Sequence, residues 1–352
     1  MSGSADLAAC EAAIRTGSYS FHAASRLLPG HVRDGAIALY AFCRCADDTV
    51  DLRDDKLRAL NGLRDRLERI YAGRPANRAA DRAFADLVAR VAMPRTLPEA
   101  LLEGFAWDAM GRRHATLSDV RAYSARVAAA VGAMMCVIMQ ARDGDVIARA
   151  CDLGVAMQLT NIARDIGEDA AAGRIYLPLD WLEEEGLTPD AFLRDPGPGP
   201  ATARMTRKLL FEADRLYHRA EAGVAGLPLS CRPAILAARH IYAAIGGQIA
   251  RADHDSVSRR ARTGAARKIA LASLALGQAA VGTVMPRSAL IHASPLAETR
   301  FLVEAAARRT RETAAGDGRA ETLLQLFAQL EARDRTRPRP NGGIEQGGIG
   351  AI

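Results

Sequence analysis

Hydrophobic residues recur along this chain with the period of an α-helix, and no segment convincingly shows the alternation of apolar and polar residues that marks a strand. Alanine, leucine and arginine, which favour helices, are abundant, whereas β-branched and aromatic runs are scarce. Prolines interrupt the pattern at residues 93–99 and 186–202, and we expect the second segment to be a loop. The pattern predicts one all-α domain over residues 1–334 and a disordered Gly/Pro-rich tail over residues 335–352.

Two of the predicted helices carry a stripe of polar residues in otherwise apolar sequence. The first stripe consists of Tyr40, Arg44, Asp47 and Asp51, and the second of Gly154, Gln158, Asn161, Asp165 and Asp169. Residues three or four apart share one face of a helix, so each stripe ends in two carboxylates one turn apart, roughly 6 Å along the axis. Because the flanking residues are apolar, we expect both helices to be buried.

Carboxylates at this spacing repel one another unless a cation lies between them. Mg²⁺ fits such a site, since it binds one or two carboxylates, retains water and completes its shell with phosphate oxygens. Two acidic stripes in one chain therefore predict a cavity that binds metal ions and diphosphates between two carboxylate walls. The alternative is that these acids are buried in ion pairs with Arg44 and Arg164.

Composition and charge limit the classes of partner that the protein is expected to bind. Its 352 residues, 49% of them apolar and 25% charged, can bury a sizeable core. The net charge of +6 fits a general arginine bias, with attraction to anionic ligands or a membrane surface as the alternative. The basic residues are spread along the chain without interleaved aromatic residues, which argues against nucleic-acid binding.

The cysteines and the N-terminus suggest a cytoplasmic protein. The N-terminal residues lack the cationic and apolar segments of a signal peptide. The cysteines show no metal-ligand spacing and lie mostly in apolar segments, so we expect reduced core residues. They are Cys10, Cys43, Cys45, Cys136, Cys151 and Cys231.

Two apolar segments resemble membrane spans in composition. Residues 127–139 are too few for the roughly 20 that a span requires. Residues 269–285 are longer but still short, and Pro286 ends the segment. A buried core helix is the favoured interpretation of residues 269–285. The alternative is a helix that touches the bilayer surface beside the mouth of an apolar cavity.

The second polar stripe belongs to a longer pattern that resembles a signature of the squalene and phytoene synthase family. The matching residues are Gly154, Gln158, Asn161, Ile162, Arg164, Asp165, Asp169, Arg174, Tyr176 and Pro178. Residues 17–21, 40–51 and 123–135 resemble three further motifs of that family, in the expected order. The likeness extends from about residue 17 to residue 245, and the sequence overall, including residues 107–113, looks most like bacterial phytoene synthases.

The resemblance implies an all-α bundle of the isoprenoid synthase type around a central cavity. It implies head-to-head condensation of two geranylgeranyl diphosphates, through the cyclopropyl intermediate prephytoene diphosphate, to phytoene, the first committed step of carotenoid biosynthesis. Mg²⁺, or Mn²⁺ in its place, would be the cofactor, and no nicotinamide is expected. The lipid substrates and the basic chain lead us to expect peripheral contact with the inner face of the cell membrane.

The same resemblance implies roles for individual residues. Those that would bind or face the metal are Asp47, Asp51, Asn161, Asp165 and Asp169. Those that would hold diphosphates are Ser18, Ser20, Tyr40, Arg44, Gln158, Arg164 and Arg174, while Tyr123 and Tyr242 would line the reacting centre. Tyr19 stands where many members of the family have lysine, so one cation expected at the diphosphate is missing.

The expected chemistry needs charge at one end of the cavity and an apolar surface at the other. Arginines and metal ions neutralise the departing diphosphate, and the allylic cation that remains must be shielded from water. The small residues within 125–133 either open room for a prenyl chain or serve tight helix packing. Tyr123 can face a cation with its ring, or exchange a proton through its hydroxyl.

Other classes of protein fit the sequence less well. A chain-elongating prenyl diphosphate synthase would carry a second Asp-Asp-x-x-Asp motif, and a terpene cyclase would carry Ser or Thr in place of Asp165. Intact acids in both stripes argue against a non-catalytic lipid-binding protein. Within the family, a squalene or dehydrosqualene synthase acting on farnesyl diphosphate is the alternative, since the C15 or C20 preference depends on the floor of the cavity.

Overall fold

Helices are the only regular elements in the part of the chain that this computed structural model describes, which comprises residues 4–17, 25–51, 56–283 and 288–308. Within these ranges the side chains of residues 4, 15–17, 47–51 and 56–57 are not described. The predicted all-α class is confirmed. The helices are α1 (Ser4–Gly17), α3 (Gly30–Asp51), α4 (Lys56–Tyr71), α5 (Ala79–Val91), α6 (Thr96–Ala109), α7 (Leu117–Ser124), η1 (Ala125–Ala129), α8 (Ala130–Ile138), α9 (Gly144–Ala171), α10 (Leu179–Glu184), α11 (Pro189–Arg194), α12 (Pro200–Val224), η2 (Leu229–Cys231), α13 (Arg232–Arg251), α14 (Ala265–Val281), η3 (Ala289–His292), η4 (Ala297–Thr299) and α15 (Arg300–Ala307).

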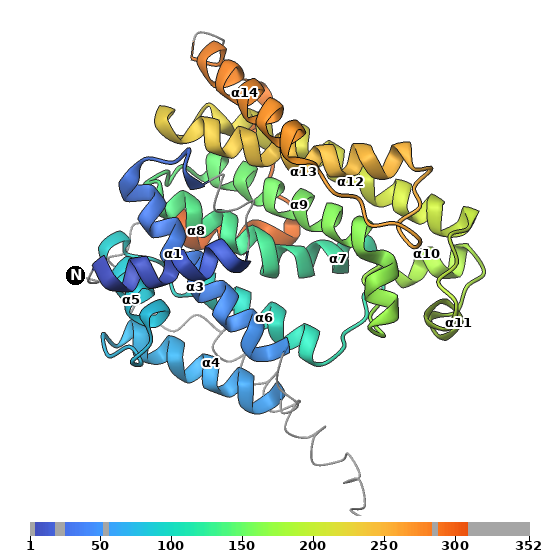
Figure 1. Ribbon diagram of the computed structural model, residues 1–352, viewed down its shortest axis with the longest axis horizontal. Helices are drawn as coiled ribbons and strands as arrows, with labels where there is room; N and C mark the ends of the chain where they lie inside the picture. The colour runs from blue at the N-terminus through green and yellow to red at the C-terminus, as the bar shows by residue number, and fades with distance from the viewer. Residues whose placement is uncertain (1–3, 18–24, 52–55, 284–287, 309–352) are drawn as a thin grey trace, which may run out of the picture.

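The long helix α9 runs through the middle of the molecule (Figure 1). It packs against α8, α12, α13 and α15, so other helices surround it. Its start is fixed by Asp143, whose carboxylate accepts the backbone N–H groups of Asp145 and Val146 at 2.9 and 3.1 Å. Val155, Leu159 and Ile162 beside its polar stripe are buried, Leu153 and Met157 are half-buried, and the stripe itself is mostly half-buried. The expectation that this helix is buried is confirmed.

The helix α3 brings the first acidic stripe onto a helical backbone. The backbone stays helical to Asp51, so Asp47 and Asp51 stand one turn apart as predicted. The other side of α3 packs on α5, where the rings of Phe42 and Phe84 stack with centroids 4.3 Å apart. The six cysteines are all free, and each is buried or half-buried, as expected of reduced core residues.

The segment η1 is a π-helix that lies directly against α9. A Cβ atom at Gly154 would lie 2.5 Å from the Cα atom of Ala129, and one at Gly132 would lie 2.8 Å from the carbonyl oxygen of Ala150. Ala125, Ala129 and Ala133 are fully buried. At these positions the small residues serve tight helix packing, which was one of the two interpretations of the sequence.

Proline positions explain where the loop predictions succeed and fail. The break at residues 93–99 is confirmed, since α5 ends at Val91 and α6 begins at Thr96. The expectation of a loop throughout 186–202 is wrong, because the short helix α11 forms within it and α12 starts at Pro200. Proline lacks the N–H that a first helical turn leaves unpaired, so Pro189 and Pro200 begin helices here.

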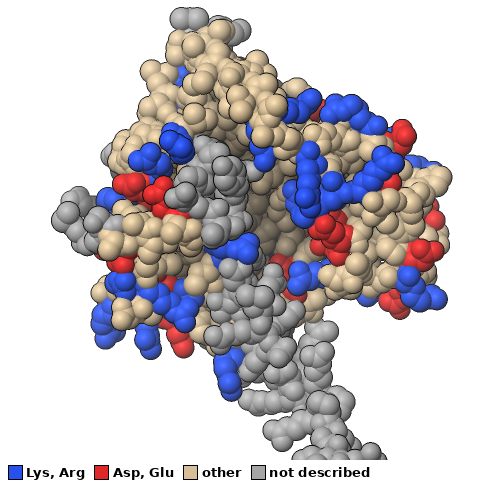
Figure 2. Space-filling view, in the orientation of Figure 1, with Lys and Arg blue, Asp and Glu red and all other residues tan. Residues whose placement is uncertain are grey.

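The apolar segment near residue 269 forms α14, and the favoured interpretation of it as a buried core helix is wrong. Only Ala275 and Ala279 of α14 are buried, in contact with the neighbouring helix α13. Ile269, Leu276 and Val281 are 68%, 50% and 55% exposed. The small alanines face the protein and the large side chains face outward, so Figure 2 shows a mostly uncharged surface where α14 lies.

One helical stretch in the described part of the chain is long and apolar enough to cross a membrane. It is Leu117–Ile138, which combines α7, η1 and α8. Of its most apolar window, 56% is buried inside the protein. The core helix of a folded domain has the same properties, and this stretch packs on α6 and α9.

Candidate active site

The charged end of the α9 stripe is organised around Asp165. Arg164 donates to its carboxylate from Nε at 2.7 Å and from Nη2 at 2.5 Å. Arg260, from the loop after α13, donates from Nε at 2.9 Å and also pairs with Glu168 at 3.2 Å. The alternative in which a stripe acid pairs with Arg164 is therefore realised for Asp165, with a second arginine added.

The loop that carries Arg260 rests on α9. The backbone N–H of Gly167 donates to the carbonyl of Ser256 at 3.1 Å. A Cβ atom at Gly167 would lie 2.6 Å from the carbonyl oxygen of Val257, so glycine is needed at this close approach. Arg260 was not identified from the sequence, where nothing distinguishes it from its neighbour Arg259.

The two carboxylates of the stripe have opposite pKa shifts. Burial alone would raise the pKa of Asp165, but the hydrogen bonds and charges of Arg164 and Arg260 outweigh burial and lower it. Burial raises the pKa of Asp169 to about 7, and the negative charge of Asp165 adds to the increase. In the described part of the chain no side chain forms a hydrogen bond or ion pair with the Asp169 carboxylate.

The donor set of this stripe fits a divalent cation. Besides the two carboxylates, the side-chain oxygen of Asn161 is buried without a hydrogen-bond partner, while its nitrogen donates to Gln158 at 3.3 Å. Amide and carboxylate oxygens are the ligands that Mg²⁺ binds in proteins. Residues 4–17, 25–51, 56–283 and 288–308 contain no preassembled group of three His, Cys, Asp or Glu side chains. The side chains of Asp47 and Asp51 lie outside the described residues.

Residues predicted to hold diphosphates are brought together in part. Tyr242 on α13 lies near both Arg164 and Tyr40. Burial raises the pKa of Tyr242, nearby Arg164 opposes the increase, and nearby Tyr40 adds to it. Gln158 is half-buried on the α9 stripe, and Arg44 is exposed on α3. Ser18 and Ser20 lie outside the described residues.

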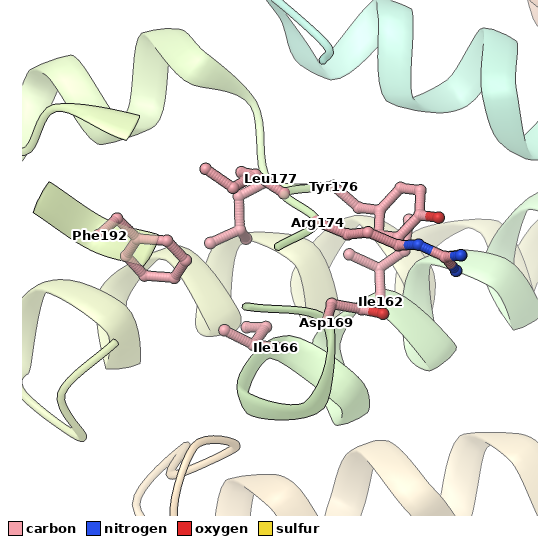
Figure 3. A pocket seen from close by; sticks show the side chains of 8 residues that line it. Ile162, Ile166, Asp169, Arg174, Tyr176, Leu177 and Phe192 are labelled. Atoms are coloured by element: carbon pink, nitrogen blue, oxygen red, sulfur yellow. The ribbon is translucent and has the colours of Figure 1, made fainter. Parts of the chain in front are cut away.

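Arg174 and Tyr176 follow α9 and line a small pocket together with Asp169. Figure 3 shows Arg174 and Tyr176 side by side, with their polar ends on the same side as the carboxylate of Asp169. The opposite end of the pocket is apolar and includes Phe192 and Leu177. In this pocket a charged end thus adjoins an apolar one.

Tyr123 is buried and does not stand alone. Its hydroxyl donates to Asp108 at 2.9 Å, and the hydroxyl of Tyr176 donates to the other oxygen of Asp108 at 2.7 Å. The two tyrosine rings stack with centroids 5.2 Å apart, and the ring of His114 lies 5.2 Å from that of Tyr123. Asp108 was assigned no role from the sequence, although its place after the buried Trp107 at the end of α6 was a signal.

Comparison with known proteins identifies the family of the chain. The model of the squalene/phytoene synthase family matches residues 14–267. The chain is 58% identical to a phytoene synthase from Cereibacter sphaeroides, covering 97% of this chain and 98% of that protein. It is 57% identical to a phytoene synthase from Rhodobacter capsulatus, covering 95% of this chain and 98% of that protein. A crystal structure of a dehydrosqualene synthase in complex with ligand superposes with a TM-score of 0.73 at 29% identity, covering 78% of this chain and 97% of that one. The chain belongs to the squalene/phytoene synthase family.

Proposed function

We propose that this protein is a phytoene synthase, which condenses two geranylgeranyl diphosphates head to head and releases two diphosphates. One observation carries the proposal. Tyr176, which is hydrogen-bonded to Asp108 together with Tyr123, lines the same pocket as Asp169 of the α9 stripe. The residues expected to bind diphosphate therefore lie next to aromatic residues. The similarity to proteins named phytoene synthase extends over nearly the whole chain and supports the C20 substrate.

The arginines around Asp165 would bind the diphosphate of each substrate in turn. Arg164 and Arg260 already lie at one carboxylate, and a guanidinium group matches phosphate oxygens as well as carboxylate oxygens. Bound Mg²⁺, held by Asn161, Asp165 and Asp169 with Asp47 and Asp51, would neutralise charge on the leaving diphosphate. The resemblance extends this role to Arg174, beside Asp169.

The product ends as an alkene because a proton, and no hydride, closes the reaction. The first ionisation and loss of a proton give the cyclopropyl intermediate, and a second ionisation and rearrangement give a C40 cation. A further proton loss then yields phytoene. A squalene synthase would instead deliver hydride from a nicotinamide, and we expect no such requirement here.

Product analysis tests this function. Purified enzyme is incubated with the C20 or the C15 diphosphate, with and without Mg²⁺, Mn²⁺ and NADPH, and the hydrocarbons are extracted. We expect phytoene from the C20 substrate with Mg²⁺ alone, and less activity with Mn²⁺. A C30 product formed from the C15 substrate at higher kcat/KM, or an absolute need for NADPH, would assign the protein to the squalene branch of the family.

We also propose that α14 rests on the cytoplasmic face of the membrane without spanning it. Its large apolar residues are exposed, and its first turn carries Arg267 and Lys268, which suit an anionic bilayer. A C40 hydrocarbon is insoluble in water, so release into a bilayer would complete the cycle.

Vesicle sedimentation tests the membrane contact. The enzyme should sediment with phosphatidylcholine vesicles that contain phosphatidylglycerol, and less at high salt. Leu276→Glu should weaken this binding, whereas Leu290→Glu, an exposed leucine on η3, should not. Absence of binding at low salt would exclude the contact, and binding that survives alkaline carbonate would indicate an inserted segment.

A further inference from the structure

Asp108 accepts the hydroxyl hydrogens of two stacked tyrosines. Tyr123 donates to its Oδ2 at 2.9 Å and Tyr176 to its Oδ1 at 2.7 Å. The three residues come from α6, α7 and the segment after α9, so the arrangement is a tertiary contact. Each oxygen of the carboxylate accepts a hydrogen bond from one of the two phenols.

This arrangement fixes what the tyrosine oxygens can do. A phenol has a single hydrogen to donate, and in both tyrosines it is directed to Asp108. The oxygen of Tyr123, which lies beside the Tyr176 hydroxyl, can therefore only accept a further hydrogen bond or a proton. Burial raises the pKa of Tyr123, and the charge of Asp108 adds to the increase, so the residue stays a neutral phenol at neutral pH.

The surroundings hold this group beside the charged end of the site. Tyr176 lines the same pocket as Asp169 and Arg174. On the other side His114 is only 1% exposed and lies against both rings, and neither of its nitrogens has a hydrogen-bond partner among the described residues. The His114 ring therefore limits ring motion without competing for the hydroxyl groups.

We propose that Asp108 is a positioning residue that makes Tyr123 a proton acceptor in the condensation, an inference that rests on the proposed function. When a prenyl cation loses a proton, the electron pair of the broken C–H bond forms the new carbon–carbon bond. The proton binds to the oxygen of Tyr123, whose own hydrogen moves along the hydrogen bond to Asp108. Asp108 ends as a neutral carboxylic acid and later returns its proton to solvent. No oxidant or reductant is involved.

The test compares steady-state constants of Asp108→Asn and Tyr123→Phe with those of the wild type. An amide has one acceptor oxygen and does not take up a proton at neutral pH. Asp108→Asn should therefore lower kcat by about 10²-fold or more, the usual contribution of general acid–base catalysis, with little change in KM. Tyr217→Phe is the matched control. Tyr217 is also buried, but its hydroxyl lies 2.9 Å from Thr160 and not at a carboxylate, so kcat should change little.

Chemical rescue separates proton transfer from a structural role. Formate added to Asp108→Ala should raise kcat by roughly tenfold or more by supplying a carboxylate, whereas formamide should not. If Asp108→Asn does not fold, Tyr123→Phe carries the test, since its kcat should fall and formate should not restore it. A near wild-type kcat for Asp108→Asn, or no rescue by formate, overturns the inference alone. A wild-type enzyme without turnover of either prenyl diphosphate overturns the proposed function and this inference with it.

Discussion

Arg260 donates a hydrogen bond of 2.9 Å to Asp165, although the two residues lie 95 positions apart in the chain. The contact holds the loop after α13 over the acidic stripe of α9, where Gly167 lets the loop backbone approach closely. A cation from this loop is thereby placed at the carboxylate that already pairs with Arg164.

Replacing Arg260 should weaken substrate binding. Loss of one charge-assisted hydrogen bond to a diphosphate should raise KM roughly tenfold in Arg260→Gln. Arg259→Gln is the matched control, because it removes the same charge from the same loop but leaves the ion pair between Arg260 and Asp165 in place. KM is measured with the C20 diphosphate at saturating Mg²⁺. Equal values for the two variants would show that the Arg260 contact has no part in binding.

Removing a carboxylate from the α9 stripe should abolish most of the activity. Asp165→Asn or Asp169→Asn should lower kcat by at least about 10²-fold, as loss of a main electrostatic stabiliser does. The fold of Asp169→Asn should survive, because burial already disfavours the charge of Asp169. The Asp165→Asn protein is also checked for folding by circular dichroism, since Arg164 and Arg260 lose the carboxylate that they share. Asp145→Asn is the control, since Asp145 lies on the same helix but pairs with His292. Near wild-type turnover of either stripe variant across a Mg²⁺ titration would exclude a metal role for that residue.

The sequence predicts the parts of this molecule that depend on local periodicity. The stripe of α9 can be recognised because polar residues seldom recur at helical spacing along an otherwise apolar helix unless they share a function. The metal and diphosphate roles of Ser18, Ser20, Asp47 and Asp51 stay predictions, since these side chains lie outside the described residues. Mg²⁺ and the membrane contact likewise stay predictions.

The sequence does not show which distant segments contact one another, or what covers an apolar helix face. Asp108 becomes significant only when Tyr176, 68 residues later, reaches it. For α14, apolar residues show that a surface avoids water, but not whether protein or lipid covers it. The same limit applies to the small residues of η1, whose packing against Gly154 depends on the placement of α9.

Asp152 should be among the residues most important for stability. It is fully buried and pairs with the buried Arg149 at 2.8 Å and with Arg219 at 2.9 Å. Arg149 also donates to the carbonyls of Leu290 and Ala293, which holds that segment on α9. Asp152→Asn leaves two cations facing each other and should lower the free energy of unfolding by roughly 3–5 kcal/mol.

Urea denaturation measures this loss, and an exposed ion pair provides the comparison. Lys208 pairs with Glu184 at the surface, with side chains 41% and 56% exposed. Because water and salt screen such a pair, Lys208→Met should change the free energy of unfolding far less than Asp152→Asn does. Similar losses for the two variants would contradict the importance of burial for the Asp152 network.

His114 should make stability depend on pH. Burial lowers its pKa to about 4, with the charge of Arg112 adding to the decrease, whereas an unfolded histidine has a pKa near 6.5. Between these values the unfolded chain binds a proton that the folded chain does not, so the stability from neutral His114 is complete above about pH 6.5 and is lost as pH falls toward 4. His114→Phe keeps a ring without titrating. Denaturation at pH 7.5 and pH 5 should show a smaller loss for this variant than for the wild type, and equal losses would exclude His114 as a source.

Gly154 should tolerate no side chain. A methyl group there would meet the Cα and N atoms of Ala129 at 2.5 and 2.7 Å, and backbone atoms cannot move aside as a flexible side chain can. Gly154→Ala should lower the free energy of unfolding by roughly 1–3 kcal/mol or more, as overpacking a core does. Gly62 in α4 has open space around its Cβ position, so Gly62→Ala should stabilise the protein by roughly 0.5–1 kcal/mol through its helix propensity. If Gly154→Ala lowers the free energy of unfolding and Gly62→Ala raises it, contact with η1, and not helix propensity, decides the residue at position 154. A stabilising Gly154→Ala would contradict the close approach of the two helices.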